Sequence, residues 1–285
     1  MFISERRERL FSFPSLPESL KAGYSFGDLR LRPFGLYEND LNVDFNQPLR
    51  PFLVTEILEC CTREVRGREV EPGFFWRLPV GKRIECLLTL AASGTGSEIS
   101  RTFRCLNEEC GLDLEVEISA DEIVAQQNEA YETERVEVSL ATDALALRRP
   151  TADDQRTWLK IRFADERSVV HTMVRTLLLE EGAGTAIEEA IPSELVQAVD
   201  RAMEEHDPLV NFTVTVRCSS CGMESLLEID LEELSLRCLR QAQLRLLASV
   251  HSLAAHYHWS EQQIFSVPYW RRAWYLSLIE KEKNQ

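Results

Sequence analysis

The sequence has no apolar run of the roughly 18 residues that a membrane-spanning helix needs, and it has no excess of basic side chains. Its 32 lysines and arginines are outnumbered by 47 aspartates and glutamates, so the formal net charge is −15. Nucleic-acid scaffolds neutralise phosphates with cationic side chains, and this balance argues against one. The first residues, MFISERRERLFSF, lack the apolar core and cleavage site of a signal peptide. We therefore expect a cytoplasmic protein without a membrane span.

Motifs of the common catalytic classes are also lacking. His251, His256 and His258 cluster in HSLAAHYHW, but there is no HExxH pattern. His251 and His256 are five residues apart and do not share one face of a helix. Paired glutamates occur without a partnered nucleophile. We predict a binding protein and no enzyme, and a metallohydrolase that uses these histidines is the less favoured alternative.

Cysteine is plentiful by comparison, and four of the eight cysteines belong to a repeated segment. The first copy, SRTFRCLNEECGLDLEVEISADEI, covers residues 100–123, and the second, NFTVTVRCSSCGMESLLEIDLEEL, covers residues 211–234. Each copy contains an alternating run, an Arg-Cys pair, a second cysteine followed by glycine, and another alternating run. This pattern predicts a β-hairpin whose turn carries two thiols, which we call a knuckle.

The two knuckles together supply the four thiolates of a closed tetrahedral zinc site: Cys105, Cys110, Cys218 and Cys221. One knuckle cannot complete such a site, so the fold must bring two distant segments together. A glycine after each second cysteine permits the tight turn that directs backbone amides at the sulfurs. We predict one structural zinc ion. Two alternatives stay open: hairpins that pack without metal, or a disulfide framework, which a cytoplasmic location disfavours.

Hydrophobic periodicity predicts mostly helices outside the knuckles. Helices are expected over residues 52–65, 81–92, 121–127, 151–161, 165–180, 193–207, 231–259, 260–266 and 269–283, and strands over 134–140 and 144–148. Cys60 and Cys61 lie in the first of these helices. Adjacent helical residues point about 100° apart, so we interpret both cysteines as core or neutral positions.

The predicted fold class is α+β: a zinc-ribbon-like pair of β-hairpin knuckles, a helical insertion between them, and a long C-terminal helix followed by short helices. The expected regions are a loop-rich N-terminal arm (1–50), helices with the first knuckle (51–125), a mostly helical insertion (126–207), the second knuckle (208–232), and the long helix with aromatic C-terminal helices (233–285). Aromatic residues of the arm either pack on the body or dock on a partner.

The C-terminal region is dense in large aromatic and basic side chains, which are frequent in protein interfaces. We predict the following residues to bind a partner: His256, Tyr257, Trp259, Phe265, Tyr269, Trp270, Arg271, Arg272 and Trp274.

Two blocks carry a family resemblance: LPVGKRIECLLTLAASGTGSEISRTFRCLNEECGLDLEVEI and CSSCGMESLLEIDLEELSLRCLRQAQLRLLASVHSLAAHYHWSEQQIFSVPYWRRAWYLSLI. They resemble the myovirus-type baseplate hub assembly chaperones, which are encoded beside tail-tube and baseplate genes in contractile phage tails and phage-tail-like injection systems. Family knuckles often have Cys-Pro-x-Cys, whereas this chain has Cys-Ser-Ser-Cys and two extra residues in the first pair.

The resemblance implies a non-enzymatic assembly factor or baseplate component of a contractile injection system. Its expected partners are baseplate, hub or tail-tube proteins, with no nucleic acid. Its expected location is the cytoplasm, and whether the finished particle retains it is left open. The rival class is a zinc-ribbon regulator that binds nucleic acid.

Overall fold

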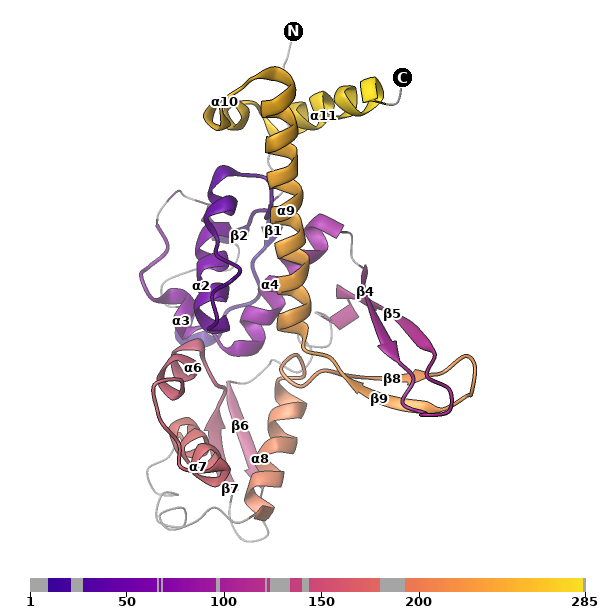
Figure 1. Ribbon diagram of the computed structural model, residues 1–285. Coiled ribbons are helices and arrows are strands. Elements are labelled where there is room, and N and C mark those ends of the chain that lie inside the picture. The colour runs from indigo at the N-terminus through magenta and orange to yellow at the C-terminus, as the bar shows by residue number, and fades with distance from the viewer. Residues whose placement is uncertain are drawn as a thin grey trace.

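The computed structural model describes residues 10–21, 28–65, 67, 69–95, 98–120, 122–123, 134–139, 144–179 and 193–283. Its long axis is helix α9, Leu231–Tyr257, which runs vertically in Figure 1 with the other elements arranged along it. Within the described residues no helix combines the length and the hydropathy needed to cross a membrane.

The helices and strands that precede α9 are, in chain order, β1 (Phe11–Ser12), α1 (Glu18–Lys21), β2 (Leu29–Leu31), the 3-10 helix η1 (Glu38–Asn42), α2 (Arg50–Cys61), β3 (Thr62–Glu64), α3 (Phe74–Arg77), α4 (Val80–Thr95), β4 (Glu98–Arg104), β5 (Asp113–Ser119), β6 (Arg135–Ser139), β7 (Ala144–Arg148), α6 (Ala152–Trp158), α7 (Glu166–Leu177), α8 (Ser193–His206), β8 (Thr213–Arg217) and β9 (Glu224–Glu228). After α9 follow α10 (Glu261–Ser266) and α11 (Tyr269–Lys283). The helix expected over 121–127 lies largely outside the described residues.

The N-terminal elements pack against α2, α4 and α9 in the largest hydrophobic core. Strands β1, β2 and β3 form an antiparallel sheet, in which Leu31 pairs with Thr62. The helix that we expected over 52–65 therefore ends at Cys61, because the next three residues pair with β2. Phe13 and Phe34 of the arm are buried in this core. The arm's other aromatics at positions 24 and 26 lie outside the described residues.

The first turn of α4 contains three residues that join it to its neighbours. A Cβ added at Gly81 would overlap the carboxylate of Asp207, so glycine lets the end of the insertion approach α4 closely. Arg83 is buried, and its Nη2 donates to Oγ1 of Thr55 in α2 at 2.9 Å. Lys82 is also buried, with Nζ 2.7 Å from Oε2 of Glu85 in the same helix and 3.2 Å from Oγ of Ser15 in the N-terminal arm. The start of α4 is thus a junction between the N-terminal core and the insertion.

The insertion has its own hydrophobic core. In the β6–β7 hairpin, Val136 pairs with Leu147 and both side chains are buried beneath α7 and α8. Helix α6 begins where the sequence predicts, after Thr151, whose side chain accepts a hydrogen bond from the Asp154 amide. Two ion-paired hydrogen bonds join Asp154 to Arg148 at the end of β7, at 2.6 and 2.8 Å. The insertion forms the lower lobe in Figure 1.

Helices α10 and α11 pack on the C-terminal end of α9 around Leu253, Ile264 and Ile279. The predicted capping box at Ser260 is present, with its hydroxyl accepting from the Gln263 amide. The two small helices form the upper end of the molecule in Figure 1, opposite the insertion. The fold is thus the predicted mixture of helices with small antiparallel hairpins.

Candidate functional site

The two knuckles are closed by the same backbone hydrogen bond. At the end of β4, the amide of Cys105 donates to the carbonyl of Leu112 at 2.8 Å, and at the end of β8 the amide of Cys218 donates to Met223 at 2.8 Å. Gly111 has φ +57° and Gly222 has φ +73°, a left-handed conformation that glycine adopts without strain. The sequence repeat is therefore also a structural repeat.

The two extra residues of the first knuckle are accommodated by Asn107. Its carbonyl accepts from the amides of Cys110 and Gly111 at 2.9 and 3.1 Å, and its side-chain oxygen accepts from the Glu109 amide at 3.0 Å. Asparagine favours such local turns because its side chain can bond to backbone amides two residues further on. The longer knuckle thus returns its second cysteine to the same side as Cys105.

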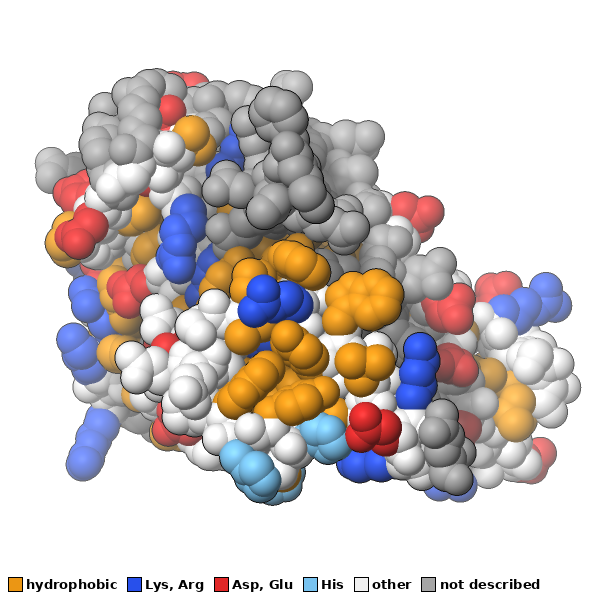
Figure 2. Space-filling view, turned by 90° about the horizontal axis from the view of Figure 1, so that it is seen from above, with side chains coloured by type: hydrophobic (Ala, Val, Ile, Leu, Met, Phe, Trp, Pro, Cys, Tyr) orange, Lys and Arg blue, Asp and Glu red, His pale blue; other side chains and the backbone are white. Residues whose placement is uncertain are grey.

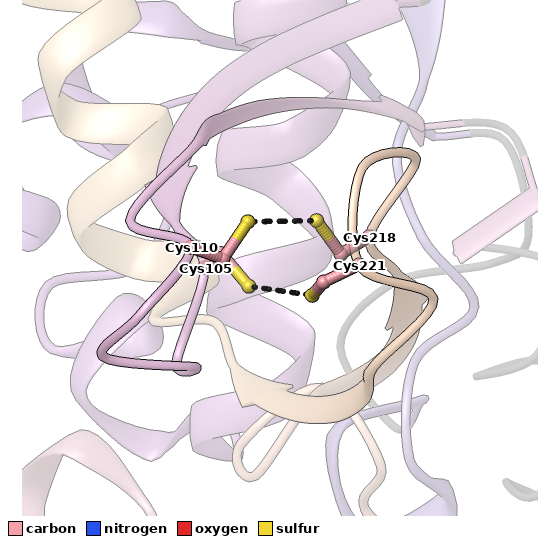
Figure 3. A group of neighbouring side chains, drawn as sticks. All are labelled: Cys105, Cys110, Cys218 and Cys221. Atoms are coloured by element: carbon pink, nitrogen blue, oxygen red, sulfur yellow. Dashed lines mark hydrogen bonds between the residues drawn. The ribbon is translucent and has the colours of Figure 1, made fainter.

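The four predicted ligands come together at the tips of the hairpins, as Figure 3 shows. Sγ of Cys105 lies 3.6 Å from Sγ of Cys221, Sγ of Cys110 lies 3.8 Å from Sγ of Cys218, and the four sulfurs all lie within 4.8 Å of one another. A tetrahedral ion with Zn–S bonds of about 2.3 Å separates its sulfurs by about 3.8 Å. The cluster has the ligand type and the spacing of a four-thiolate metal site.

A disulfide framework is excluded by the same geometry. A disulfide needs two sulfurs about 2.05 Å apart, well below the separations at the knuckles. All eight cysteines lie in the described part of the chain, and all are free thiols. The disulfide alternative is therefore wrong for this structure.

The pKa values of two thiols in the cluster are shifted in opposite directions. Hydrogen bonds from the amides of Cys221 and Ser220 lower the pKa of Cys218 to about 6. The Asn107 amide favours the thiolate of Cys105, but burial and the neighbouring sulfurs outweigh it and raise the pKa of Cys105 to about 12. Negative charges on sulfurs this close together repel one another. A bound divalent cation would remove that repulsion and displace the protons.

The second knuckle leads directly into the long helix. Strand β9 ends at Glu228, and Asp230 caps α9, with its carboxylate accepting from the Glu233 amide at 2.9 Å. Arg50, at the start of α2, forms ion pairs with Asp230 at 2.5 Å and with Glu233 at 3.1 Å. The cysteine cluster is therefore separated from the base of α9 by one short strand.

A second group of possible ligands consists of Asp40 and the adjacent Cys60 and Cys61, whose ligand atoms lie within 4.8 Å of one another although we expected both cysteines to be core or neutral positions. Its Asp40 carboxylate is already occupied, because Oδ2 accepts from three successive backbone amides at residues 35–37. Nη2 of Arg32 lies 2.6 Å from Oδ1 of Asp40 and 3.0 Å from Sγ of Cys60. The positively charged guanidinium occupies the position that a metal cation would take. We therefore interpret this buried network as structural. No sequence pattern marks it.

The structure divides the nine predicted partner-binding residues into three groups. His256, Trp270, Arg271 and Trp274 are exposed, whereas Tyr257, Trp259, Phe265 and Tyr269 are half-buried and Arg272 is buried. Nη2 of Arg272 donates to the carbonyl of Leu36 at 2.5 Å, and its guanidinium lies 4.8 Å from the centre of the Phe265 ring. Arg272 therefore joins α11 to the N-terminal segment, and its contacts are internal.

The half-buried aromatics at the end of α9 pack on one another. Tyr257 stacks on Trp259 with ring centroids 4.9 Å apart, and both contact Tyr275.

Within the described residues, no cluster of three possible metal ligands includes a histidine. The structure offers no support for a catalytic histidine metal site in that part of the chain.

Comparison with known families adds one match. Residues 27–235 match the family described as T4 bacteriophage base plate protein. This stretch contains both knuckles and the insertion, and it ends at Ser235, near the start of α9, so α10 and α11 lie beyond it. No curated protein and no solved structure matches the chain. Because the match covers well over half of the sequence, the chain belongs to the T4 bacteriophage base plate protein family.

Proposed function

We propose that Cys105, Cys110, Cys218 and Cys221 bind one structural zinc ion. The support is the closeness of the four sulfurs, with each cross-hairpin pair at about the separation that tetrahedral zinc requires. Four thiolates leave no coordination position for water, so the ion stabilises the fold and does not activate a substrate. The ion would join the tips of the two hairpins, which strand β9 separates from the base of α9.

The zinc proposal is tested by metal analysis of protein purified without chelator. We expect about one zinc per chain, and about none in Cys218→Ser. The matched control is Cys238→Ser, which removes a half-buried thiol of α9 outside the cluster. Zinc below half an equivalent in the unaltered protein, or equal loss in both variants, would refute the site.

The exposed end formed by α10, α11 and the end of α9 is the surface that we propose contacts a partner. Figure 2 looks down on this end, where hydrophobic side chains gather with basic side chains among them and histidine near the edge. Trp270, Trp274 and Leu278 recur every four residues along α11, with exposed fractions of 40%, 65% and 45%. Exposed tryptophans in one stripe are typical of binding sites.

The function that these features favour is non-enzymatic assembly of a contractile injection particle. The family points to a structural role in the baseplate, and the resemblance to hub assembly chaperones suggests the finer role of an assembly factor. In this proposal the cysteine cluster holds the base of α9, and the distant end of α9 presents α10 and α11 to a baseplate, hub or tail-tube protein. The protein acts in the cytoplasm during assembly.

The assembly role is tested with point variants, because deleting residues 260–285 would also expose Leu253. We expect Trp270→Ala/Trp274→Ala to remain folded and to reduce the yield of assembled particles. The matched control is Leu159→Ala, which removes another exposed apolar side chain, in the insertion. Normal particle yield with the tryptophan variant would overturn the role of this end.

A further inference from the structure

Helix α9 has a second exposed face that differs in charge from the rest of the protein. Six residues with helical spacing lie on it, and we call them the α9 stripe: Arg237, Arg240, Leu244, Leu247, Ala248 and His251. All six are exposed, whereas Leu239, Leu246 and Leu253 on the opposite side of the helix are buried. With a rise of about 1.5 Å per residue, the stripe is about 21 Å long.

Two leucines occupy the middle of the stripe. Leu244 and Leu247 are 47% and 46% exposed, on neighbouring turns of the helix. A single exposed leucine needs no explanation, but paired leucines flanked by basic residues on one face are a common arrangement for binding another helix. Ala248 lies beside them and allows a second backbone to approach closely.

The charge of this region is opposite to that of the chain. Residues 234–260 contain no aspartate or glutamate and include three arginines, although the whole chain has a formal charge of −15. Within the described part of the chain, neither Arg237 nor Arg240 forms an ion pair. An acidic protein thus exposes an apolar stripe whose charged side chains are basic.

Charge complementarity selects among the possible occupants of the stripe. Two parallel copies of the chain docked through it would place arginines opposite arginines, and two antiparallel copies would place them opposite Ala248 and His251, so neither arrangement gives the arginines a carboxylate partner. Nucleic acid would find few cationic side chains and two leucines on the stripe, and the net negative charge of the rest of the protein would repel its phosphates. An amphipathic helix with leucine-like side chains and flanking carboxylates would satisfy both the apolar and the basic residues.

We propose that the α9 stripe binds an acidic amphipathic helix of another protein of the same particle. The proposal rests on the proposed function only in assigning the partner to the particle. The stripe and the tryptophan end surface are separate sites, so each can be correct without the other.

The binding site is tested by placing a photo-crosslinking amino acid at position 244 of the full chain. The variant is co-expressed with the particle's other baseplate proteins, and adducts are identified by mass spectrometry. We expect an adduct with a helical segment of net negative charge, and no adduct from the same probe at position 159. An adduct with a second copy, with nucleic acid or with a basic segment would overturn the proposal, as would the lack of any adduct at position 244.

The charge requirement is tested by the affinity of the captured protein for two variants. Arg237→Glu/Arg240→Glu should weaken binding at least about tenfold, because it places like charges in contact. Arg162→Glu/Arg167→Glu makes the same change in net charge at exposed residues of the insertion and should leave affinity within about twofold. Equal effects would show that only net charge matters and would refute a specific site.

Failure of the α9 stripe and failure of the end surface would give different experimental results. If Trp270→Ala/Trp274→Ala assembles normally while the probe at position 244 captures an acidic helix, the end surface is wrong and the stripe stands. If the tryptophan variant fails to assemble and position 244 captures nothing, the stripe is wrong and the assembly role stands.

Discussion

The hairpin of the insertion and the two knuckle hairpins differ in what holds them in place. In β6–β7, alternate side chains such as Val136 and Leu147 are buried between α7 and α8. In β8–β9, the inward residues of β8 are only half-buried, β9 buries Ser225 and Leu227, and the sulfur cluster lies at the far tip. A two-stranded hairpin alone is only marginally stable in water. The comparison teaches that the β6–β7 hairpin is held along its length by buried side chains, whereas the knuckle hairpins meet at their tips, where the proposed ion would act.

The largest effect is expected when the cluster is broken, as in Cys218→Ser. Because β8–β9 has little core of its own, its amides should lose hydrogen-exchange protection almost completely, and those of β4–β5 should follow. The amides of β6–β7 should keep their protection, because that hairpin does not touch the cluster. Equal loss in all three hairpins would show that the cluster does not hold the knuckle hairpins specifically.

A core truncation in the insertion should have the complementary effect. Leu147→Ala removes a fully buried side chain from the β6–β7 hairpin, so we expect a loss of about 2–5 kcal/mol in the free energy of unfolding. Zinc content should not change. Denaturant unfolding followed with metal analysis of the same samples measures both, and loss of zinc would show that the two regions are coupled.

An intermediate effect is expected at the junction between the two regions. Gly81→Ala places a methyl group against the Asp207 carboxylate, and the shift needed to relieve the overlap should cost about 1–3 kcal/mol. The double variant Gly81→Ala/Asp207→Ala should recover part of the loss, which thermal unfolding of the single and double variants would reveal. No recovery would place the strain elsewhere.

Acid should weaken the insertion through Asp154. Burial raises the pKa of this carboxyl, but hydrogen bonds from Arg148 and Thr151 outweigh burial and lower it. Since the folded pKa lies below the unfolded value of about 3.9, the stabilisation is present above that pH and is lost as pH falls through the folded pKa. The contribution is about 1 kcal/mol, since Arg148 is partly exposed.

The acid effect is measured by urea unfolding between about pH 2.5 and pH 6. Stability of the unaltered protein should fall more steeply below about pH 4 than that of Asp154→Asn, which has lost the titrating group. Parallel pH profiles would show that Asp154 does not contribute.

The smallest effect on stability is expected at Trp274, although it is the more exposed of the two exposed tryptophans of α11. Because 65% of it is exposed, Trp274→Ala should change the free energy of unfolding by no more than about 0.5 kcal/mol. Thermal unfolding beside the particle-yield assay separates the two properties. A large drop in stability would make Trp274 part of the fold.

Structural features that depend on short sequence motifs were predictable. The caps at Thr151 and Ser260 are short motifs, and the knuckles are recognisable because Gly111 and Gly222 follow cysteines at similar spacing. The convergence of the four sulfurs was also predictable, because half a ligand set at each knuckle requires the other half. These signals depend on residues within a few positions of one another.

Features that depend on distant neighbours were not predictable. Strand β2 is three residues long, too short to show an alternating pattern, so its pairing with β3 could not be predicted from the sequence. The helix predicted over 52–65 therefore included the residues of β3. Arg272 was expected at the surface, because its carbonyl partner, Leu36, lies more than 200 residues earlier. Which face of α9 remains uncovered is likewise decided by the packing of other elements.

The order in which the chain is synthesised determines when the sulfur cluster can form. Cys105 and Cys221 are 116 positions apart, and a ribosome that adds about 5–20 residues per second needs roughly 6–23 seconds to pass from one to the other. During that interval the first knuckle has two thiols and no second pair to complete the set. The four-sulfur centre therefore forms only after the insertion has been translated, and α9 is made directly after its last cysteine.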